Sequence, residues 1–274
     1  MSGALPEGVV MALEGTRLAR CRHGLMLYFA QDRFIGRSLE EYGEYTEEEI
    51  ELFAQVVAPG MTVVEAGTNI GTHTLPLARM VGEAGRVVAF EPQRRVFQVL
   101  CANLALNGIG CVDAHWAALG EAVGEAAVPA LFASAAGNVG GMAIGEEAGE
   151  EVVPVRTVDG LGLAACGFMK VDVEGMEAAV LRGARATIAR HRPVLYVEND
   201  RPAQSPGLIA LLLELGYRCY WHVAMYVRVP NFRGRTDDVF GNMAAFNLLC
   251  LPRERAAVLT GFREVTGPQD RWHP

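Results

Sequence analysis

The stretch MTVVEAGTNIGTHTLPLARM, residues 61–80, contains a strand, a turn and a helix in succession. Residues 61–66 form an apolar run that predicts a buried strand, and residues 72–80 have the spacing of a helix. The turn between them contains Gly67 and Gly71, which allow the backbone to pass close to a ligand. This order of elements is typical of α/β proteins that bind ligands at the ends of their strands.

The same alternation continues along the chain. Further strands are predicted at residues 86–91, 112–117, 167–173, 193–198, 217–221 and 245–251, and further helices at residues 95–106, 176–189 and 208–215. Strands that alternate with helices form mostly parallel sheets covered on both faces. We therefore predict an α/β fold with a mostly parallel, seven-stranded, Rossmann-like sheet and helices on both faces.

The first 45 residues follow a different pattern. Residues 17–21 and 24–29 predict a small β-hairpin, so we divide the chain into an N-terminal hairpin extension, 1–45, and a main domain, 46–274. Thr46 and Glu49 have the spacing of a capping box at the start of a helix. Glu44 and Tyr45 precede this helix and are candidates to close over a ligand.

A Gly- and Ala-rich region, residues 120–150, interrupts the alternation. We interpret it as short strands or loop inserted into the main pattern. Asn138 and the pair 140–141 within it could serve as a lid, but a plain loop is the preferred interpretation.

Composition excludes several classes of protein. The chain has 274 residues, of which 51% are hydrophobic, and this composition is not that of a disordered protein. Its 24 basic and 32 acidic residues give a net charge of −8, which disfavours broad binding to nucleic acid or to an anionic membrane. Six scattered cysteines suggest neither a zinc site nor a disulfide framework. With no signal peptide or spanning segment apparent, we expect a cytoplasmic protein. The oligomeric state is not evident.

An acidic residue ends the second predicted strand of the main domain. Glu91 follows Gly71 by twenty residues, where a carboxylate can accept hydrogen bonds from both hydroxyls of a ribose. The dinucleotide fingerprint G-x-G-x-x-G fails, because its third and sixth positions, counted from Gly67, are Asn69 and Thr72. The pattern E-x-G-x-N-x-G with a later acid resembles the S-adenosylmethionine site of class I methyltransferases. That resemblance implies methionine over the glycine turn and adenine near the loop after the third strand.

Four motifs extend the resemblance. The segment KVDVEGMEAAVLRGA, residues 170–184, resembles the signature of the FkbM-type methyltransferase family, and so do residues 64–71, 117–120 and 156–159. The family usually has Asp and Ala where this chain has Glu65 and Thr68. The similarity covers roughly residues 45–200. It implies transfer of a methyl group from S-adenosylmethionine, usually to a hydroxyl oxygen of a sugar, glycan or polyketide-like natural product, without fixing one substrate.

The glycine turn and the resemblance together assign a set of cofactor-binding residues. Trp116, at the expected adenine position, is a candidate to stack on the ring. The full set is Glu65, Gly67, Thr68, Asn69, Gly71, Thr72, Glu91, Pro92, Trp116, Ala117 and Asp172.

The residues that act on the acceptor are expected at the ends of the later strands. Asp172 ends the fourth strand and Glu198 the fifth, so their carboxylates are predicted to converge. Catalytic candidates, including those for the base, are Asp172, Glu174, Glu198 and His222. Lys170, within the fourth strand, is expected to be buried and paired with an acid.

A magnesium site is the less favoured alternative at this position. Asp172, Glu198 and Asn199 offer oxygen ligands of the kind that Mg²⁺ prefers, and their arrangement resembles that of catechol-type O-methyltransferases. The FkbM-type family is not generally defined by a metal, so no metal is assigned.

The favoured function is O-methylation of a sugar, glycan or natural-product-like small molecule, with S-adenosylmethionine as cofactor and a small hydroxylated acceptor. One alternative is an NAD(P)-dependent oxidoreductase, which Asn69 in place of a glycine argues against. Another is a non-catalytic S-adenosylmethionine-binding domain, which the retained acids Glu65 and Glu91 argue against. The position of methylation and the role of residues 231–243 are not evident.

Overall fold

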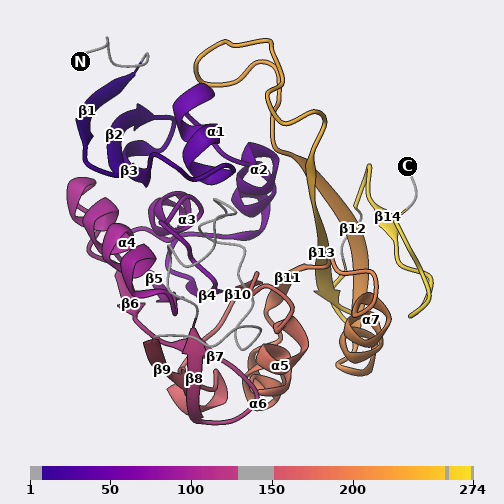
Figure 1. The fold of residues 1–274 in the computed structure, drawn as a ribbon. Helices are drawn as coiled ribbons and strands as arrows, with labels where there is room; N and C mark the ends of the chain where they lie inside the picture. The colour runs from indigo at the N-terminus through magenta and orange to yellow at the C-terminus, as the bar shows by residue number, and fades with distance from the viewer. Residues whose placement is uncertain (1–7, 129–150, 257–258, 273–274) are drawn as a thin grey trace.

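The computed structural model describes residues 8–128, 151–256 and 259–272. In these ranges the main sheet has eight strands in the order β14-β12-β13-β11-β10-β4-β5-β6 (Figure 1). Its strands are β4 (Thr62–Ala66), β5 (Arg86–Phe90), β6 (Val112–His115), β10 (Phe168–Val171), β11 (Val194–Glu198), β12 (Tyr217–Met225), β13 (Ala244–Pro252) and β14 (Arg263–Glu264).

The sheet is mixed. The five strands from β6 to β11 run parallel, whereas β13 is antiparallel to both β11 and β12. The predicted α/β class is confirmed. The count of seven strands is wrong, because the short strand β14 adds an eighth by pairing with β12 at the edge.

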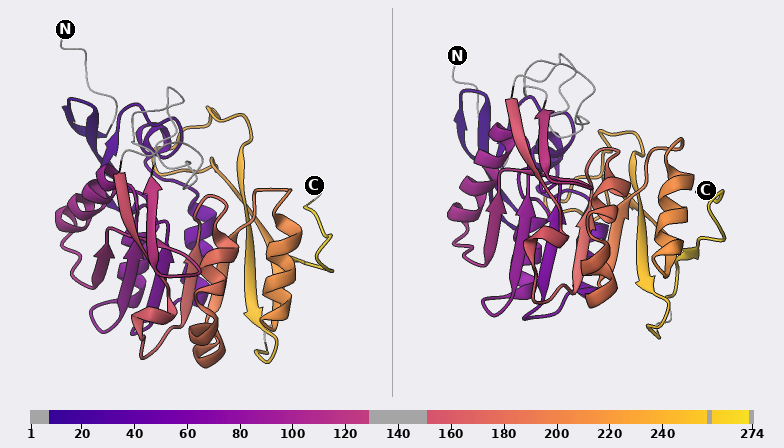
Figure 2. Two further views of the ribbon diagram at one scale, coloured as in Figure 1. Left: turned by 60° about the horizontal axis from the view of Figure 1, so that its bottom comes forward. Right: turned by 90° about the horizontal axis from the view of Figure 1, so that it is seen from below.

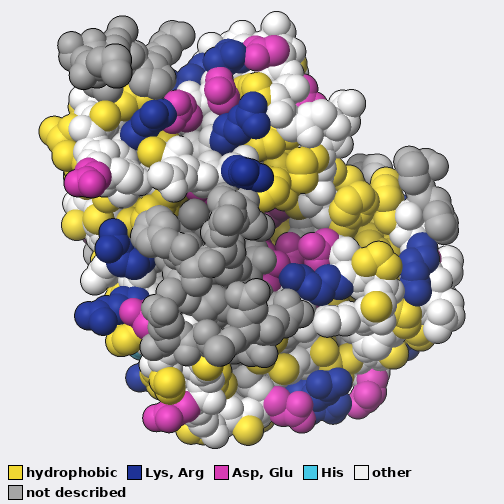
Figure 3. Space-filling model, in the orientation of Figure 1, with side chains coloured by type: hydrophobic (Ala, Val, Ile, Leu, Met, Phe, Trp, Pro, Cys, Tyr) yellow, Lys and Arg dark blue, Asp and Glu magenta, His cyan; other side chains and the backbone are white. Residues whose placement is uncertain are grey.

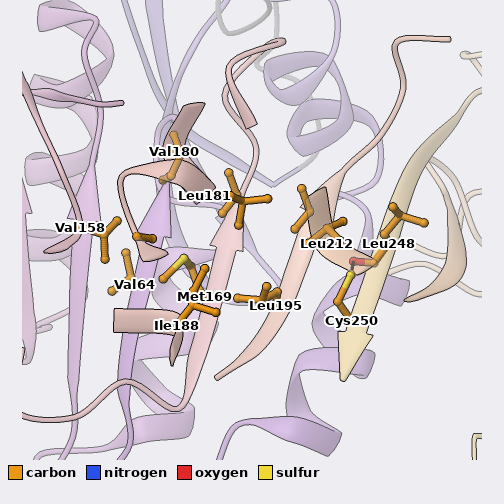
Figure 4. Packing of buried hydrophobic residues seen from close by; sticks show 14 of the residues in the cluster. Val64, Val158, Met169, Val180, Leu181, Ile188, Leu195, Leu212, Leu248 and Cys250 are labelled. Carbon is orange, nitrogen blue, oxygen red and sulfur yellow. Dashed lines mark hydrogen bonds between the residues drawn. The ribbon is translucent and has the colours of Figure 1, made fainter. Parts of the chain in front are cut away.

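Helices pack against both faces of this sheet, as the two views of Figure 2 show. One layer consists of α2 (Glu47–Val56), α3 (Thr74–Val81) and α4 (Arg94–Leu106), and the other of α5 (Glu177–Arg182), α6 (Arg185–His191) and α7 (Ser205–Glu214). Figure 4 shows the core on the second face, where strand residues Val64, Met169, Leu195 and Leu248 meet helix residues Val180, Leu181, Ile188 and Leu212. The described helices include none that is both long enough and apolar enough to cross a bilayer.

The predicted single helix at residues 176–189 is instead two short helices, α5 and α6. Gly183 separates them, and a Cβ there would lie 2.0 Å from the carbonyl oxygen of Gly120. The Asp159 carboxylate then accepts hydrogen bonds from the first turn of α6, at 2.9 Å from the N–H of Ala186 and 2.7 Å from that of Thr187. These two hydrogen bonds cap the N-terminus of α6, so α6 begins as a separate helix.

Three antiparallel strands form an N-terminal sheet, where the sequence predicts two. They are β1 (Val9–Leu13), β2 (Thr16–Cys21) and β3 (Gly24–Phe29), followed by α1 (Ile35–Glu41). Asn103 on α4 accepts a hydrogen bond from the N–H of Leu27 at 2.7 Å, which fixes β3 against the main domain. Another three-stranded sheet is formed by β7 (Ala118–Leu119), β8 (Gly124–Val128) and β9 (Glu151–Arg156). Of these strands only β8 belongs to the Gly- and Ala-rich region, whose residues 129–150 lie outside the described residues. Asn138 and residues 140–141 lie outside the described residues.

The predicted capping box at the start of α2 is wrong. Thr46 has a left-handed backbone with φ of 40° and makes no side-chain hydrogen bond to the helix. Its Oγ1 lies 3.0 Å from Nε2 of His73, and the Glu49 carboxylate instead accepts a hydrogen bond from Nδ2 of Asn247 at 3.2 Å. Both side chains of the expected box are therefore directed to long-range contacts.

Candidate functional site

A cavity of about 220 Å³ lies at the carboxyl ends of the parallel strands. The turn after β4, the ends of β5, β10 and β11, and the segments that follow α1 and β12 supply its walls. The wall residues are Asp32, Phe34, Ile35, Tyr45, Glu49, Gly67, Thr68, Asn69, Thr72, His73, Glu91, Lys170, Asp172, Glu174, Glu198, Asp200, Tyr226, Met243, Ala244, Ala245 and Asn247.

A second, smaller cavity adjoins the first. The two share Gly67, Glu91, Asp172 and Glu174. The remaining walls of the second are mostly apolar and come from Phe90, Pro92, Gln93, Ala117, Ala118, Leu119, Val173 and Met176. An apolar slot next to a carboxylate suits a flat heterocycle attached to a sugar, because the ring needs apolar walls and the sugar hydroxyls need an acceptor.

Glu91 is held at the junction of the two cavities by backbone groups. It is 6% exposed, and its carboxylate accepts hydrogen bonds from the N–H of Asn69 at 3.0 Å and of Gln93 at 2.8 Å. Burial raises the pKa of Glu91 to about 7, and the two N–H donors oppose that shift. Each carboxylate oxygen can accept a further hydrogen bond, so the group fits the two hydroxyls of a ribose.

The fold itself requires both glycines of the turn. Gly67 has a φ of 78°, and a Cβ there would lie 1.7 Å from the carbonyl oxygen of Asp172. Gly71 has a φ of 94°, and its Cβ would lie 2.8 Å from Leu100 Cδ1. Gly67 also lines both cavities, so close approach of a ligand to its backbone stays a prediction, whereas Gly71 lies outside the walls of both.

Glu65 lies outside the walls of both cavities, contrary to its predicted cofactor role. It is fully buried in β4, where its register partner on β10 is Lys170. Burial raises the pKa of Glu65 to about 7, while the positive charge of Lys170 opposes this shift. Glu65 therefore belongs to the electrostatic support of Lys170.

Trp116 also lies outside both sets of walls. Its indole N–H donates a 2.8 Å hydrogen bond to the carbonyl of Pro92, and the Arg94 guanidinium lies 5.6 Å from a Trp116 ring centroid. The adenine-stacking prediction is therefore not supported. Trp116 instead fixes Pro92, which does line the slot together with Ala117.

Three carboxylates converge at the ends of β10 and β11. One oxygen from each of Asp172, Glu174 and Glu198 lies within 4.8 Å of the other two, as the sequence predicts for Asp172 and Glu198. Lys170, 2% exposed, places Nζ 2.7 Å from Asp172 Oδ2, so the predicted buried ion pair is present. Arg201 Nη2 lies 2.7 Å from Glu174 Oε2.

Crowding of these carboxylates favours bound protons. Burial, and then the negative charges of Asp172 and Glu174, holds the pKa of Glu198 well above its usual range. Burial and the charge of Asp172 raise the pKa of Glu174 to about 7. The cluster therefore exchanges protons near neutral pH, which is the range useful to a general base.

Two of the three predicted magnesium ligands, Asp172 and Glu198, come together, and Glu174 joins them. Asn199 lies outside the walls of the large cavity and lines an adjoining hollow, which shares Glu198 with it. Lys170 and Arg201 already lie against the oxygens of this cluster. Two fixed cations at the same oxygens make a poor site for Mg²⁺.

His222 also lies away from the acceptor end of the cavity. Its Nδ1 lies 2.8 Å from the hydroxyl oxygen of Tyr196. Burial lowers the pKa of His222 to about 4, so the ring is neutral at physiological pH. The prediction of a catalytic role for His222 has no support from this geometry.

Three aromatic residues line the same cavity as the carboxylates, and of these only Tyr45 is among the residues that the sequence singles out. Phe34 and Tyr45 flank α1, whereas Tyr226 follows β12 and is distant from both in the chain. Tyr226 contacts both others edge-on, with ring centroids 6.2 Å from Phe34 and 5.5 Å from Tyr45. Neither Phe34 nor Tyr226 belongs to a helical or strand-like pattern in the sequence that would predict its place in the cavity. Figure 3 shows acidic and basic side chains gathered near the centre of one face, next to hydrophobic ones.

One family model matches more than half of the chain. The model of the Methyltransferase FkbM domain matches residues 65–219. Among solved structures, a methyltransferase FkbM from Methylobacillus flagellatus is 18% identical, with a TM-score of 0.44 over 73% of this chain and 50% of that one. The chain thus spans half the length of that protein. An S-adenosylmethionine-dependent O-methyltransferase from Thermotoga maritima is 16% identical, with a TM-score of 0.48 over 88% and 79%. The comparison with curated proteins gives no match.

Proposed function

The chain belongs to the FkbM methyltransferase family, and from this premise we propose that it transfers a methyl group from S-adenosylmethionine to a hydroxyl oxygen. The acceptor is a sugar, a glycan or a similar hydroxylated small molecule. The smaller, apolar cavity would hold the adenosine. The larger cavity would hold the acceptor near the carboxylates at the ends of β10 and β11.

The observation that carries this proposal is the placement of Glu91. Its carboxylate is buried, fixed by two backbone N–H groups and located where the apolar slot opens into the larger cavity. A group in that position would accept the ribose hydroxyls, while Pro92, Ala117 and Leu119 enclose the base. Thr68, Asn69 and Thr72 of the turn would then face the methionine part.

Bound S-adenosylmethionine would supply an electrophilic methyl group on a positively charged sulfur. The protein must orient the acceptor and receive the hydroxyl proton as the new oxygen–carbon bond forms. Lys170 fixes Asp172 and Arg201 fixes Glu174 by ion pairs of 2.7 Å each. The cluster of Asp172, Glu174 and Glu198 is therefore the group we assign to receive the proton, with Glu174 titrating near neutral pH.

Methyl-labelled S-adenosylmethionine tests this proposal. The purified protein is incubated with the labelled compound and a panel of sugars, glycosides and polyhydroxylated natural products, and the products are identified by NMR. We expect label in an O-methyl group for at least one acceptor and a large loss of turnover in Glu174→Gln. Label found on nitrogen or carbon instead would contradict O-methylation, and hydride transfer from NADPH would support the oxidoreductase alternative.

A further inference from the structure

Acidic side chains outnumber basic ones at the acceptor end of the cavity. Asp172, Glu174, Glu198 and Asp200 all line it. In the part of the chain that the structure describes, Lys170 and Arg201 are the cations paired with these four acids. Lys170 also lies opposite Glu65 on β4, so its positive charge interacts with Glu65 as well as with Asp172. An acceptor with a phosphate or a carboxylate would meet repulsion here.

One carboxylate oxygen in this cluster lacks a hydrogen-bond donor. Glu198 Oε2 is buried and has no hydrogen-bond partner among the described residues. The nearest cationic atom, Arg201 Nη1, lies 3.7 Å away, which is too long for a hydrogen bond. A buried, unpaired carboxylate oxygen is costly, and a donor brought by a ligand would relieve that cost.

Aromatic residues line the same cavity. Tyr226 contacts Phe34 and Tyr45 edge-on, and all three belong to the cavity walls. Burial, together with the negative charges of Glu198 and Asp172, raises the pKa of Tyr226 to about 12, so its hydroxyl lies within electrostatic reach of both acids. Carboxylates and aromatic rings in one cavity are the chemistry that recognises an organic ammonium group.

We propose that the acceptor is an amino sugar, whose protonated amine binds between Glu198 and the ring of Tyr226 while one of its hydroxyls is methylated. This inference rests on the proposed function and names its substrate class. A protonated amine brought close to Glu198 favours the ionised form of this carboxyl and supplies the hydrogen-bond donor that Oε2 lacks. A divalent cation fits less well, because Lys170 and Arg201 already occupy the oxygens that would bind it.

The test compares three sugars that differ in charge. Protein saturated with S-adenosylhomocysteine, a step verified beforehand by calorimetry, is titrated at pH 7 with glucosamine, glucose and glucuronate, and binding is followed by NMR. We expect glucosamine to bind at least about tenfold more tightly than glucose, and glucuronate most weakly, since a charged hydrogen bond outweighs a neutral one. Failure of S-adenosylhomocysteine to bind would overturn the proposed function, whereas normal binding with no preference for glucosamine would overturn only this inference.

Two variants assign the preference to its residues. Glu198→Gln introduces an isosteric amide in place of a carboxyl that is mostly protonated in the free protein, so the variant should fold. The amide cannot take the negative charge that a bound ammonium favours on Glu198, so the variant should reduce the glucosamine preference to less than about threefold. Glu214→Gln, on an exposed acid of α7, is the matched control and should keep the preference. A preference that survives Glu198→Gln, or glucosamine displaced by millimolar Mg²⁺, would contradict the proposed amine site.

Discussion

At the scale of single residues, the site depends on carboxylates whose surroundings differ. Glu91 is fixed by two backbone N–H donors, which leaves it free to accept hydrogen bonds from a ligand. Burial and the negative charge of Asp172 raise the pKa of Glu174 to about 7, although its ion pair with Arg201 opposes that shift. Their environments therefore assign Glu91 to ligand binding and Glu174 to proton transfer.

Substitution of Glu91 tests the binding role. We expect Glu91→Ala to weaken the binding of S-adenosylhomocysteine by about 2–4 kcal/mol, because two ribose hydroxyls lose a charged acceptor. Calorimetric titration measures the change, and Glu214→Ala serves as an exposed control. Equal affinity in wild type and Glu91→Ala would show that the ligand binds elsewhere.

Titration of the carboxylate cluster should appear in the pH dependence of turnover. Below a pKa of about 7, Glu174 is protonated and cannot receive the hydroxyl proton, so kcat should fall as pH decreases through this value. The measurement is a profile of methyl transfer from pH 5.5 to 8.5. Glu174→Gln should lower kcat and remove its fall at low pH. A wild-type profile of kcat that stays flat down to pH 5.5 would exclude Glu174 as the base.

At the scale of elements, the turn between β4 and α3 holds the sheet together as well as lining the cavity. The positive φ of Gly67 and the nearness of the Asp172 carbonyl oxygen mean that β4 and β10 can approach only with glycine at this position. The close approach of β4 and β10 at Gly67 therefore brings together the parts of the cavity wall that the turn and Asp172 contribute.

A pair of glycine substitutions separates the effect of positive φ from the effect of a steric clash at the Cβ position. Gly60 has a φ of 83° but open space around its Cβ position, whereas a Cβ on Gly67 would lie 1.7 Å from the Asp172 oxygen. We expect Gly60→Ala to cost about 1 kcal/mol from backbone strain, and Gly67→Ala to cost about 2 kcal/mol more. Urea unfolding measures both. Equal costs would mean that the backbone conformation alone determines the requirement for glycine.

The elements were largely predictable because their signals are local. The apolar run of residues 61–66, the glycines after it and Glu91 at the end of the next strand are all visible in the sequence. Their partners across the fold were not. No local signal shows that Lys170 lies opposite Glu65, or that β12 brings Tyr226 against Tyr45. The departures from prediction at Glu65, Trp116 and His222 have this same origin. Their neighbours are Lys170, Pro92 and Tyr196 respectively, each on a segment distant in sequence.

At the scale of the whole molecule, buried acids couple folding to pH. Burial raises the pKa of Glu49 to about 8 and that of Glu65 to about 7. These groups keep protons in the folded state that the unfolded chain releases above pH 4.5. Their contribution to stability is therefore complete below that pH and is lost as pH rises through 7 and 8.

The cofactor-free protein should consequently lose stability between pH 6.5 and 8.5. Each proton retained by the folded state alone contributes a fall of about 1.4 kcal/mol per pH unit. This window lies above the range in which the buried histidines His73 and His222 oppose the trend, because burial lowers both of their pKa values. Urea unfolding across the window measures the slope. Glu49→Gln should make it shallower and Glu51→Gln, an exposed acid on the same helix, should not; equal slopes would contradict the assignment.

The central claim is that the two adjoining cavities form an S-adenosylmethionine site, and calorimetric titration of the purified protein tests it most directly. S-adenosylhomocysteine and NAD are titrated separately into the wild-type protein under the same conditions. The account predicts that S-adenosylhomocysteine binds with a Kd on the order of micromolar, a binding free energy of about −8 kcal/mol, and that NAD gives no binding heat. Tight binding of NAD with no response to S-adenosylhomocysteine would contradict it.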